Sequence, residues 1–401
     1  MNTVKLGDIT FKIGSGATPR GGKSVYVSDG IALVRSQNVL DLAITRDGLA
    51  FIDDEAASKL AGAAVEPGDV LINITGDSTA RVALWDIDLP ARVNQHVAIL
   101  RPDPTHLNSR WLQYWLAQPR VKSHLLVLAS SGASRPALTK GMLSALKISL
   151  PTLAQQDKVA SVLGSLDDKI AANQRAASLS RQMVESIAET TNNYVSLGEL
   201  AVRNKRTSNP AKLGSNLVMH YSIPRFDSGS PALEPADSIK SNKNHVERAS
   251  VLVSKLNPET PRVWSIPAPS KEPFSLASTE FIVLEPSGIN QSQLYAATLH
   301  SNFHHQLASL VGGTSKSHQR VKPEEMLGCV VPDVRTLTDG QIELLETLVQ
   351  IETKAIQEAE TLAKTRDELL PLLMSGKITV REASQEAAAA GAQIPSEENE
   401  V

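Results

Sequence analysis

The chain has 401 residues, of which 41% are apolar and 21% charged, and its net charge is −3. This composition is that of a globular protein long enough to form two or three domains. It contains no apolar run of about eighteen residues and no signal-peptide pattern, and its one cysteine, Cys329, excludes an internal disulfide and a cysteine zinc site. We therefore expect a cytoplasmic protein that does not enter a membrane.

The charge is unevenly distributed along the chain. Residues 1–150 carry 16 Lys and Arg against 13 Asp and Glu, and residues 196–335 carry 15 against 12. Residues 336–401 carry 5 against 13, so the acidity lies towards the C-terminus. Two mildly basic segments are compatible with phosphate binding, although many enzymes share such an excess.

Residues 1–150 predict a mixed α/β domain that begins with a Gly- and Ser-rich loop. Short apolar runs bounded by turn residues indicate strands. Residues 108–126 have helical periodicity, and Pro119 must kink or split that helix. The predicted strands are residues 31–35, 70–75, 82–86 and 97–101.

Residues 153–191 predict a single long helix, because they contain no Pro and carry apolar residues at heptad spacing. A helix with so much apolar surface needs a partner of similar length. The chain supplies one, since a second ladder lies 186 residues downstream. The residues predicted to pack in this helix pair are Leu163, Ile170, Ala177, Val184, Val349, Ile356, Ala363 and Leu370.

The globular segments also repeat. Residues 251–254 follow residues 70–73 by 181 positions, and Pro332 follows Pro151 by the same interval. A constant offset over several landmarks indicates an internal duplication. We predict a domain at 1–150, a helix at 151–195, a second domain at 196–335, a second helix at 336–383 and a disordered acidic tail at 384–401.

Motifs for catalysis are weak. Gly22-Lys23-Ser24 resembles the end of a phosphate loop, but Ala17 stands where that motif needs Gly. His300, His304 and His305 have the spacing of half a metal site without an acidic third ligand, so we interpret them as surface or DNA-facing residues. We predict no catalytic residue, no metal and no enzymatic activity of the chain's own.

Both domains instead carry Arg, Lys, Asn, Gln and hydroxyl side chains in loop segments. Such groups read base edges or hold phosphates. Each cluster alone is better explained as a solvated polar loop, and it is their recurrence in both copies that favours DNA binding. The candidate DNA-binding residues are Thr18, Arg20, Lys23, Arg35, Gln37, Asn38, Arg81, Asn94, Gln95, Arg203, Lys205, Arg206, Lys240, Lys243, Lys255, Lys316, His318, Gln319 and Arg320.

Over about residues 3–383 the chain resembles the specificity subunit of type I restriction–modification systems. The resemblance rests on the order of several short motifs together with the duplication. One departure is that the second copy lacks the Gln pair that follows Pro151 in the first. The motifs are GATP at 16–19, PGDVL at 67–71, NQ at 94–95, PTLAQQ at 151–156, SKLNP at 254–258, RVW at 262–264, STEF at 278–281, GTS at 313–315, HQRV at 318–321 and LLPLLMSGKI at 369–378.

The resemblance implies a mixed α/β fold with two tandem target-recognition domains, each followed by a long helix, and the two helices packed as an antiparallel coiled-coil-like spacer. It implies recognition of a bipartite, asymmetric double-stranded DNA target. It further implies two methyltransferase (modification) subunits docked on the spacer, with a restriction or translocase subunit joining that core. S-adenosylmethionine would be bound by the methyltransferase, and no cofactor by this chain. The alternatives are a single-chain modifying enzyme, and a stand-alone DNA-binding regulator that uses the helix pair for dimerisation.

Overall fold

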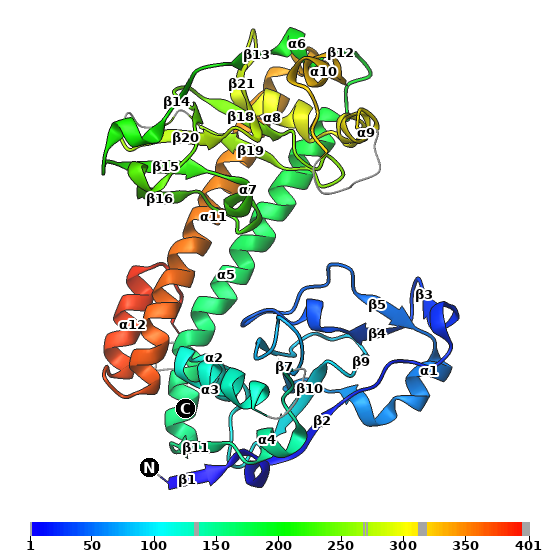
Figure 1. Ribbon diagram of the computed structural model, residues 1–401, viewed down its shortest axis with the longest axis vertical. Helices are drawn as coiled ribbons and strands as arrows, with labels where there is room; N and C mark the ends of the chain where they lie inside the picture. The colour runs from blue at the N-terminus through cyan, green and yellow to red at the C-terminus, as the bar shows by residue number, and fades with distance from the viewer. Residues whose placement is uncertain (1, 132–135, 268, 270–271, 312–318, 395–401) are drawn as a thin grey trace. The chain divides into compact units, whose positions relative to one another are not determined.

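The computed structural model describes residues 2–131, 136–267, 269, 272–311 and 319–394. The chain divides into two compact units. Unit 1 comprises Met1–Lys169 with Thr361–Val401, and unit 2 comprises Ile170–Glu360. Each unit contains one mixed α/β head and one section of each of two long helices, α5 (Leu153–Ala188) and α11 (Asp339–Met374) (Figure 1).

The head of unit 1 is built on two main β-sheets. One is four-stranded and antiparallel, in the order β2-β10-β7-β8. The other is five-stranded, in the order β3-β5-β4-β9-β6, with β4 and β9 parallel. A short pair, β1-β11, joins the first strand of the chain to the strand that precedes α5. The strands are β1 (Asn2–Lys5), β2 (Thr10–Ser15), β3 (Tyr26–Val27), β4 (Ile31–Val34), β5 (Ala50–Ile52), β6 (Ala64–Val65), β7 (Val70–Asn73), β8 (Val82–Leu84), β9 (Ala91–Val93), β10 (Val97–Pro102) and β11 (Lys147–Leu150), and the helices are α1 (Asp54–Lys59), α2 (Ser109–Ala117), α3 (Pro119–Ser130) and α4 (Lys140–Ser144).

The four-stranded sheet has a core on each face. In β10, Ala98 and Leu100 belong to the core that includes the side chains of α2, α3 and α4, whereas Val97 and Ile99 belong to the core shared with the five-stranded sheet. Successive strand residues point to opposite faces, so a strand covered on both faces must be apolar throughout. This explains why β7 and β10 are continuous apolar runs in the sequence.

The head of unit 2 repeats this arrangement. Its four-stranded sheet has the order β13-β21-β18-β19, its five-stranded sheet the order β14-β17-β20-β15-β16, and β12 pairs with β22 as β1 pairs with β11. The elements are β12 (Tyr194–Ser196), α6 (Leu197–Leu200), β13 (Ala201–Asn204), β14 (Thr207–Ser208), β15 (Leu217–Tyr221), α7 (Ile223–Asp227), β16 (Ala232–Pro235), β17 (Lys243–His245), β18 (Ser250–Ser254), β19 (Val263–Ile266), β20 (Phe274–Ser278), β21 (Phe281–Pro286), α8 (Gln291–Leu299), α9 (Ser301–Ser309), α10 (Pro323–Gly328) and β22 (Val330–Pro332).

The predicted duplication is confirmed by these matching sheets. The two heads share the four-stranded sheet and the helices that follow it. Their five-stranded sheets differ in the order in which successive strands of the chain are placed across the sheet. The four strands predicted in the first domain correspond to β4, β7, β8 and β10. The predicted break at Pro119 is also confirmed, since Pro119 occupies the first turn of α3, where a missing backbone N–H costs nothing.

The two long helices pack together in an antiparallel sense (Figure 1). In unit 1, Asp167 of α5 pairs with Arg366 of α11, and in unit 2, Arg181 of α5 lies beside Glu352 of α11. From the first pair to the second, the residue number on α5 rises by 14, from Asp167 to Arg181. The number on α11 falls by 14, from Arg366 to Glu352, so both pairs belong to the same antiparallel register.

The buried face of α11 is wider than the predicted heptad ladder. All four predicted positions of α5 are buried, whereas on α11 Val349 and Leu370 are buried and Ile356 and Ala363 are only half-buried. Near its start α11 also packs into the core of the unit 2 head, so its apolar arc spans more than one seam. The continuously buried row lies one residue earlier than the predicted ladder, at Leu348, Ala355, Leu362 and Leu369.

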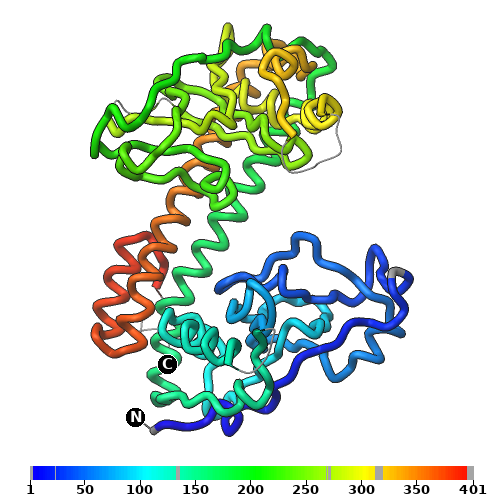
Figure 2. Tube along the Cα trace, viewed as in Figure 1, coloured from blue at the N-terminus to red at the C-terminus, as the bar shows by residue number. Residues whose placement is uncertain are grey.

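The predicted disordered tail is wrong at its start. Residues 380–389 form α12 (Val380–Ala389), which follows a turn at Gly376 after the end of α11 (Figure 2). Thr379 and Glu382 form a capping box that satisfies the first backbone N–H groups of the helix, and Ala383 and Ala387 are fully buried. Ala side chains one turn apart form a narrow apolar stripe, which cannot be recognised from the amino-acid composition of the segment. Residues 395–401 lie outside the described residues.

No helix in the described ranges has the length and apolarity needed to cross a membrane.

Candidate nucleic-acid interface

In unit 1, three loops converge through a chain of polar side chains. Thr18 Oγ1 donates to Gln95 Oε1 at 2.6 Å, and Gln95 Nε2 lies 2.9 Å from His96 Nε2. His96 Nδ1 lies 2.6 Å from Thr75 Oγ1. If the Gln95 amide donates to Nε2, the imidazole N–H is on Nδ1 and donates to Thr75. Each of these four side chains then has a hydrogen-bond partner within the row. This connected row holds the side chains of Thr18 and Gln95 in a defined orientation at the surface.

Gly16 brings the first of these loops against the second. Its N–H donates to Asn94 O at 3.2 Å, and a Cβ built on Gly16 would lie 1.7 Å from Val93 O. Only glycine allows the backbones to approach so closely. The buried Asn94 uses its Oδ1 to accept from the backbone N–H of His96, so it shapes the loop instead of facing a ligand.

The cluster at residues 35–38 has a similar bracing role. Asn38 is fully buried, and its amide donates to the carbonyl oxygens of Thr45 and Asp47. Arg35 Nη2 donates to Gly48 O at 2.5 Å, and Gln37 Nε2 reaches the same oxygen at 3.4 Å. These contacts fix the loop that precedes β5. Of the other candidates in this head, Arg20 is exposed, Arg81 is half-buried and the side chain of Lys23 lies outside the described residues.

In unit 2, the loop after β18 is joined to the segment before α10. Asn257 N donates to Gln319 O, and Val321 N donates to Lys255 O, both at 3.0 Å. Arg320 forms a bidentate ion pair with Glu280, with Nε 2.9 Å from Oε2 and Nη2 3.0 Å from Oε1. This pair holds the guanidinium in a fixed plane, and its hydrogen bonds raise the pKa of Arg320.

The same junction exists in unit 1. There Thr75 pairs with Ala137, and Leu138 N donates to Ile74 O at 2.9 Å. In each head, therefore, the loop after the second core strand meets the segment that follows the paired helices. Lys316 and His318 of the predicted site lie outside the described residues.

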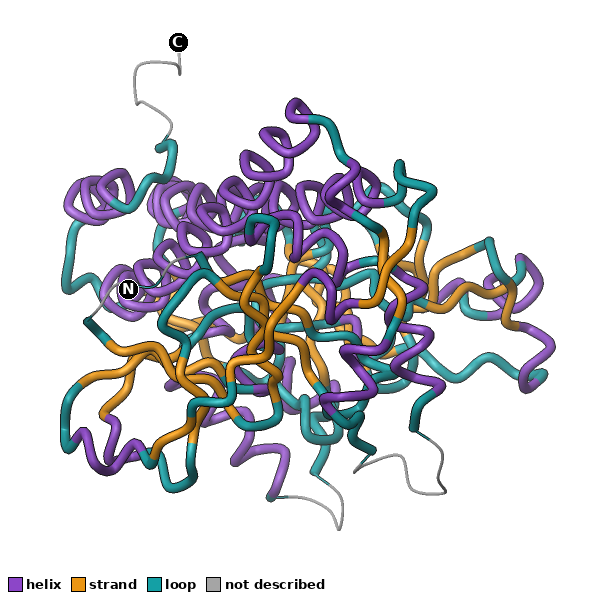
Figure 3. The backbone as a smooth tube through the Cα atoms, turned by 90° about the horizontal axis from the view of Figure 1, so that it is seen from above, coloured by secondary structure: helices purple, strands orange, loops and turns teal. Residues whose placement is uncertain are grey.

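The remaining candidates of unit 2 are divided between ion pairs and exposed positions. Arg206 contacts Glu247 at 2.7 Å and Arg203 contacts Glu324 at 3.4 Å. Lys243 is buried, donates to Ser241 O and Oγ, and has its pKa lowered by burial. Lys205 and Lys240 are exposed. Most candidate residues of both heads lie on loops, drawn teal in Figure 3.

Sequence reasoning missed two groups at these junctions. His96 connects Gln95 to Thr75, and Glu280 orients Arg320. His96 directly follows the NQ motif and Glu280 lies within the STEF motif, but nothing in the sequence shows that Glu280 and Arg320, 40 positions apart, form a pair.

Of the three histidines interpreted as surface or DNA-facing residues, His305 of α9 is exposed, whereas the N-cap residue His300 and His304 are not. His300 is buried, and its Nδ1 accepts from the backbone N–H of Asn302. His304 has a buried Nδ1 without a partner among the described residues. Burial first, and then the nearby Arg181, lower the pKa of His304 to about 4.

We expect His304 to make unit 2 sensitive to acid. The unfolded histidine binds its proton near pH 6.5, whereas the folded one stays neutral until about pH 4, so stability falls as the pH drops through this range. The expected loss between pH 7 and pH 5 is about 2 kcal/mol. In urea unfolding at both pH values, His304→Gln should lose less stability than the parent by this amount. The exposed neighbour variant His305→Gln should behave as the parent, and equal losses in all three proteins would contradict the assignment.

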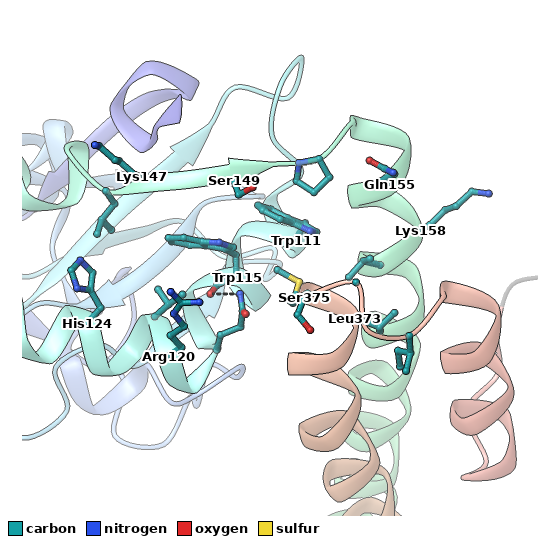
Figure 4. A pocket seen from close by; sticks show the side chains of 18 of the residues that line it. Trp111, Trp115, Arg120, His124, Lys147, Ser149, Gln155, Lys158, Leu373 and Ser375 are labelled. Carbon is teal, nitrogen blue, oxygen red and sulfur yellow. Dashed lines mark hydrogen bonds between the residues drawn. The ribbon is translucent and has the colours of Figure 1, made fainter. Parts of the chain in front are cut away.

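A pocket of ≈ 1090 Å³ lies elsewhere in unit 1 (Figure 4). Trp111 and Trp115 of α2 form one wall, and Leu373 and Met374 at the end of α11 form another. Of the predicted DNA-binding residues that the structure describes, none lines it. The loops that carry the candidate residues and this pocket are therefore separate features of the unit.

Comparison with known proteins gives one family. Residues 1–179 match the model of the type I restriction modification DNA specificity domain. The fold resembles the S subunit of a type I restriction–modification system from M. genitalium, with a TM-score of 0.56, 14% identity, and coverage of 93% of this chain and 95% of that one. An HsdS subunit from Thermoanaerobacter tengcongensis matches at 16% identity with a TM-score of 0.32, covering 97% of this chain and 96% of that one. Among curated proteins there is no match. Residues 1–179 therefore match the type I restriction modification DNA specificity domain, and the chain as a whole shares its fold with the M. genitalium S subunit.

Proposed function

We propose that the protein is the DNA-reading subunit of a type I restriction–modification complex, with each head reading one half of a bipartite target. The observation that supports this proposal is the pair of heads that share the topology of the four-stranded sheet and differ in their loops. A shared four-stranded sheet presents Thr18 and Gln95 in unit 1, but Gln319 and the Arg320–Glu280 pair in unit 2. Heads that present unlike side chains would read unlike half-sites.

The chemistry of these loops suits readout in the major groove. An amide side chain such as Gln95 or Gln319 can pair with the N6 and N7 edge of adenine, and Arg320 with the O6 and N7 edge of guanine. Arginines that are already paired with a carboxylate are held in one orientation, which lowers the entropy lost on binding. The exposed Lys205, Lys240 and Arg20 are suited to phosphates, which position the protein without specifying sequence.

We expect Gln319→Ala and Arg320→Ala to relax one base position in the second half-site. Loss of a bidentate base contact costs about 1–3 kcal/mol, enough to accept several bases at that position. The measurement is a map of methylated adenines from cells that co-express each variant with the cognate methyltransferase. Gln95→Ala is the matched variant in the other head and should relax the first half-site only. A second half-site of unchanged stringency in both variants would show that the readout loop lies elsewhere.

The helix pair is proposed to dock two methyltransferase subunits. In unit 2 it carries large apolar side chains that remain exposed, Leu179 and Met183 on α5 and Leu344 and Ile351 on α11. Leu179 and Met183 lie one turn apart, so they form a continuous strip. Exposed apolar surface of this kind is typical of a protein interface.

Replacing the strip should weaken docking without unfolding the chain. Leu179 is 59% exposed and Met183 48%, so Leu179→Asp with Met183→Asp should change the stability by no more than about 0.5 kcal/mol. Co-purification with the methyltransferase should fall at least tenfold, as two charges would replace apolar contacts. The exposed Ser178→Asp on the same helix is the control. Retention of the complex by the double variant would contradict this docking surface.

A further inference from the structure

Two buried polar triads connect the heads to the long helices. In unit 1, Tyr114 of α2 donates its hydroxyl to Asp167 Oδ2, while Arg366 Nη1 lies 2.7 Å from Asp167 Oδ1. In unit 2, Tyr295 of α8 donates to Glu352 Oε1 at 2.8 Å, and Arg181 Nη1 lies 3.7 Å from the same oxygen. Each triad therefore contains a tyrosine from the head, a carboxylate from the long helix that follows that head, and an arginine from the other long helix.

The triads are largely buried within their units, with Arg181, whose side chain is 34% exposed, as the most accessible member. Tyr114 and Tyr295 are fully buried, and Glu352 is 6% exposed. The side chains of Asp167 and Arg366 are 16% and 15% exposed. The guanidinium of Arg181 also lies 5.7 Å from the centre of the Tyr295 ring. An ion pair in such surroundings contributes little net stability, but removal of one member leaves the other charge buried without a partner.

The apolar rows of the two helices do not by themselves define one register. A heptad pattern that slides by seven residues meets an equivalent pattern. Such a slide of α11 would bring Ala359 or Leu373 opposite Asp167, so the carboxylate and Tyr114 would lose their cation. A slide of fourteen residues would bring Asp167 opposite Glu352 in one direction, and Arg181 opposite Arg366 in the other. Each alternative thus costs a buried charge or places like charges together.

We infer that the two Tyr–carboxylate–Arg triads lock the register of α5 against α11 and couple each head to both helices. Given the proposed function, on which this second part rests, they determine the spacing between the two half-sites that the subunit accepts. The positions are similar in the two halves without matching strictly. Tyr114 is the sixth residue after the N-cap Asn108, whereas Tyr295 is the fifth after the N-cap Asn290. The two halves therefore contain the same Tyr–carboxylate–Arg arrangement, with the tyrosine one position further from the N-cap in unit 1 than in unit 2.

The direct test is a distance between the heads in the full chain. Spin labels are placed on Ser58→Cys in unit 1 and Ser228→Cys in unit 2, both exposed positions, while the single native Cys329 is buried. The parent should give one narrow distance distribution. Arg181→Met with Arg366→Met should add a population displaced by about 10 Å along the helices, the length of one heptad. Asp367→Asn, which removes only the exposed partner of Arg366, should leave the distribution narrow. A single narrow distance in the double variant would overturn the register lock.

A milder pair of variants covers the case in which the double arginine variant does not fold. Tyr114→Phe with Tyr295→Phe preserves the volume of both rings and removes only the two hydroxyl contacts with the helices. The distribution should widen, and an unchanged width would overturn the inferred coupling of heads to helices.

Methylated-site mapping then tests the spacing between half-sites. The variants with a widened distance distribution should accept targets of more than one spacer length, with unchanged bases in each half. A single spacer length despite a widened distance would overturn the link to half-site spacing. Absence of any directed methylation by the parent would contradict the proposed function and leave the register result intact.

Discussion

Replacement of Ile170 by aspartate is expected to lower the free energy of unfolding by about 3 kcal/mol or more. Ile170 is 8% exposed and lies in the buried row of α5. Loss of a buried isoleucine side chain costs about 2–5 kcal/mol, and an unpaired carboxylate in that position adds a desolvation cost. Urea unfolding followed by the circular dichroism of the helices measures the change.

Two variants of the same kind calibrate this result. Ile356 on α11 is only half-buried, so Ile356→Asp should cost less than Ile170→Asp. Leu179→Asp, at an exposed position of α5, should cost no more than about 0.5 kcal/mol. Equal effects at all three positions would mean that the helices do not pack on the face described.

Gly16→Ala is expected to be the most damaging single-methyl change in the unit 1 head, with a cost of about 3 kcal/mol. The added Cβ would lie 1.7 Å from Val93 O and 2.6 Å from Val93 C, and β9 is buried in the head core. The backbone must move apart, which displaces the loop that carries Thr18 from Gln95. Thermal unfolding should detect the loss, and methylated-site mapping should show a weakened first half-site.

Gly14→Ala is the matched control, because Gly14 lies two residues before Gly16, in β2, and a Cβ there meets no described atom within 4 Å. Its cost should stay within about 0.5 kcal/mol, with both half-sites unchanged. Similar losses in the two variants would assign the effect to β2 itself instead of the close approach at Gly16.

The parts of the fold that the sequence predicts are those with a strong local period or a repeated pattern. The α5 ladder runs at heptad spacing for the full length of the helix, and residues 70–72 of β7 and 97–100 of β10 are apolar because both faces of these strands are covered. The constant 181-residue offset predicts the second head from the first. These signals need no knowledge of which segments meet in space.

What could not be predicted depends on tertiary contacts. The buried row of α11 is displaced from the heptad ladder since the unit 2 head covers an additional part of that helix. A capping box of Thr379 and Glu382 sets the first turn of α12, and this helix continues to Ala389, within the segment from residue 384 whose composition suggested disorder. For the candidate site, residue type predicts that Arg320 can bind DNA, but only the fold shows that Glu280 orients it, or that Asn38 is buried and braces a loop.

The most direct test of the account is a single-molecule map of methylated adenines in a host that co-expresses this chain with its methyltransferase. We predict methylation at one motif composed of two unlike base-specific halves, separated by a fixed number of unspecified base pairs. A continuous motif, a motif with two identical halves, or methylation that does not depend on this chain would contradict it.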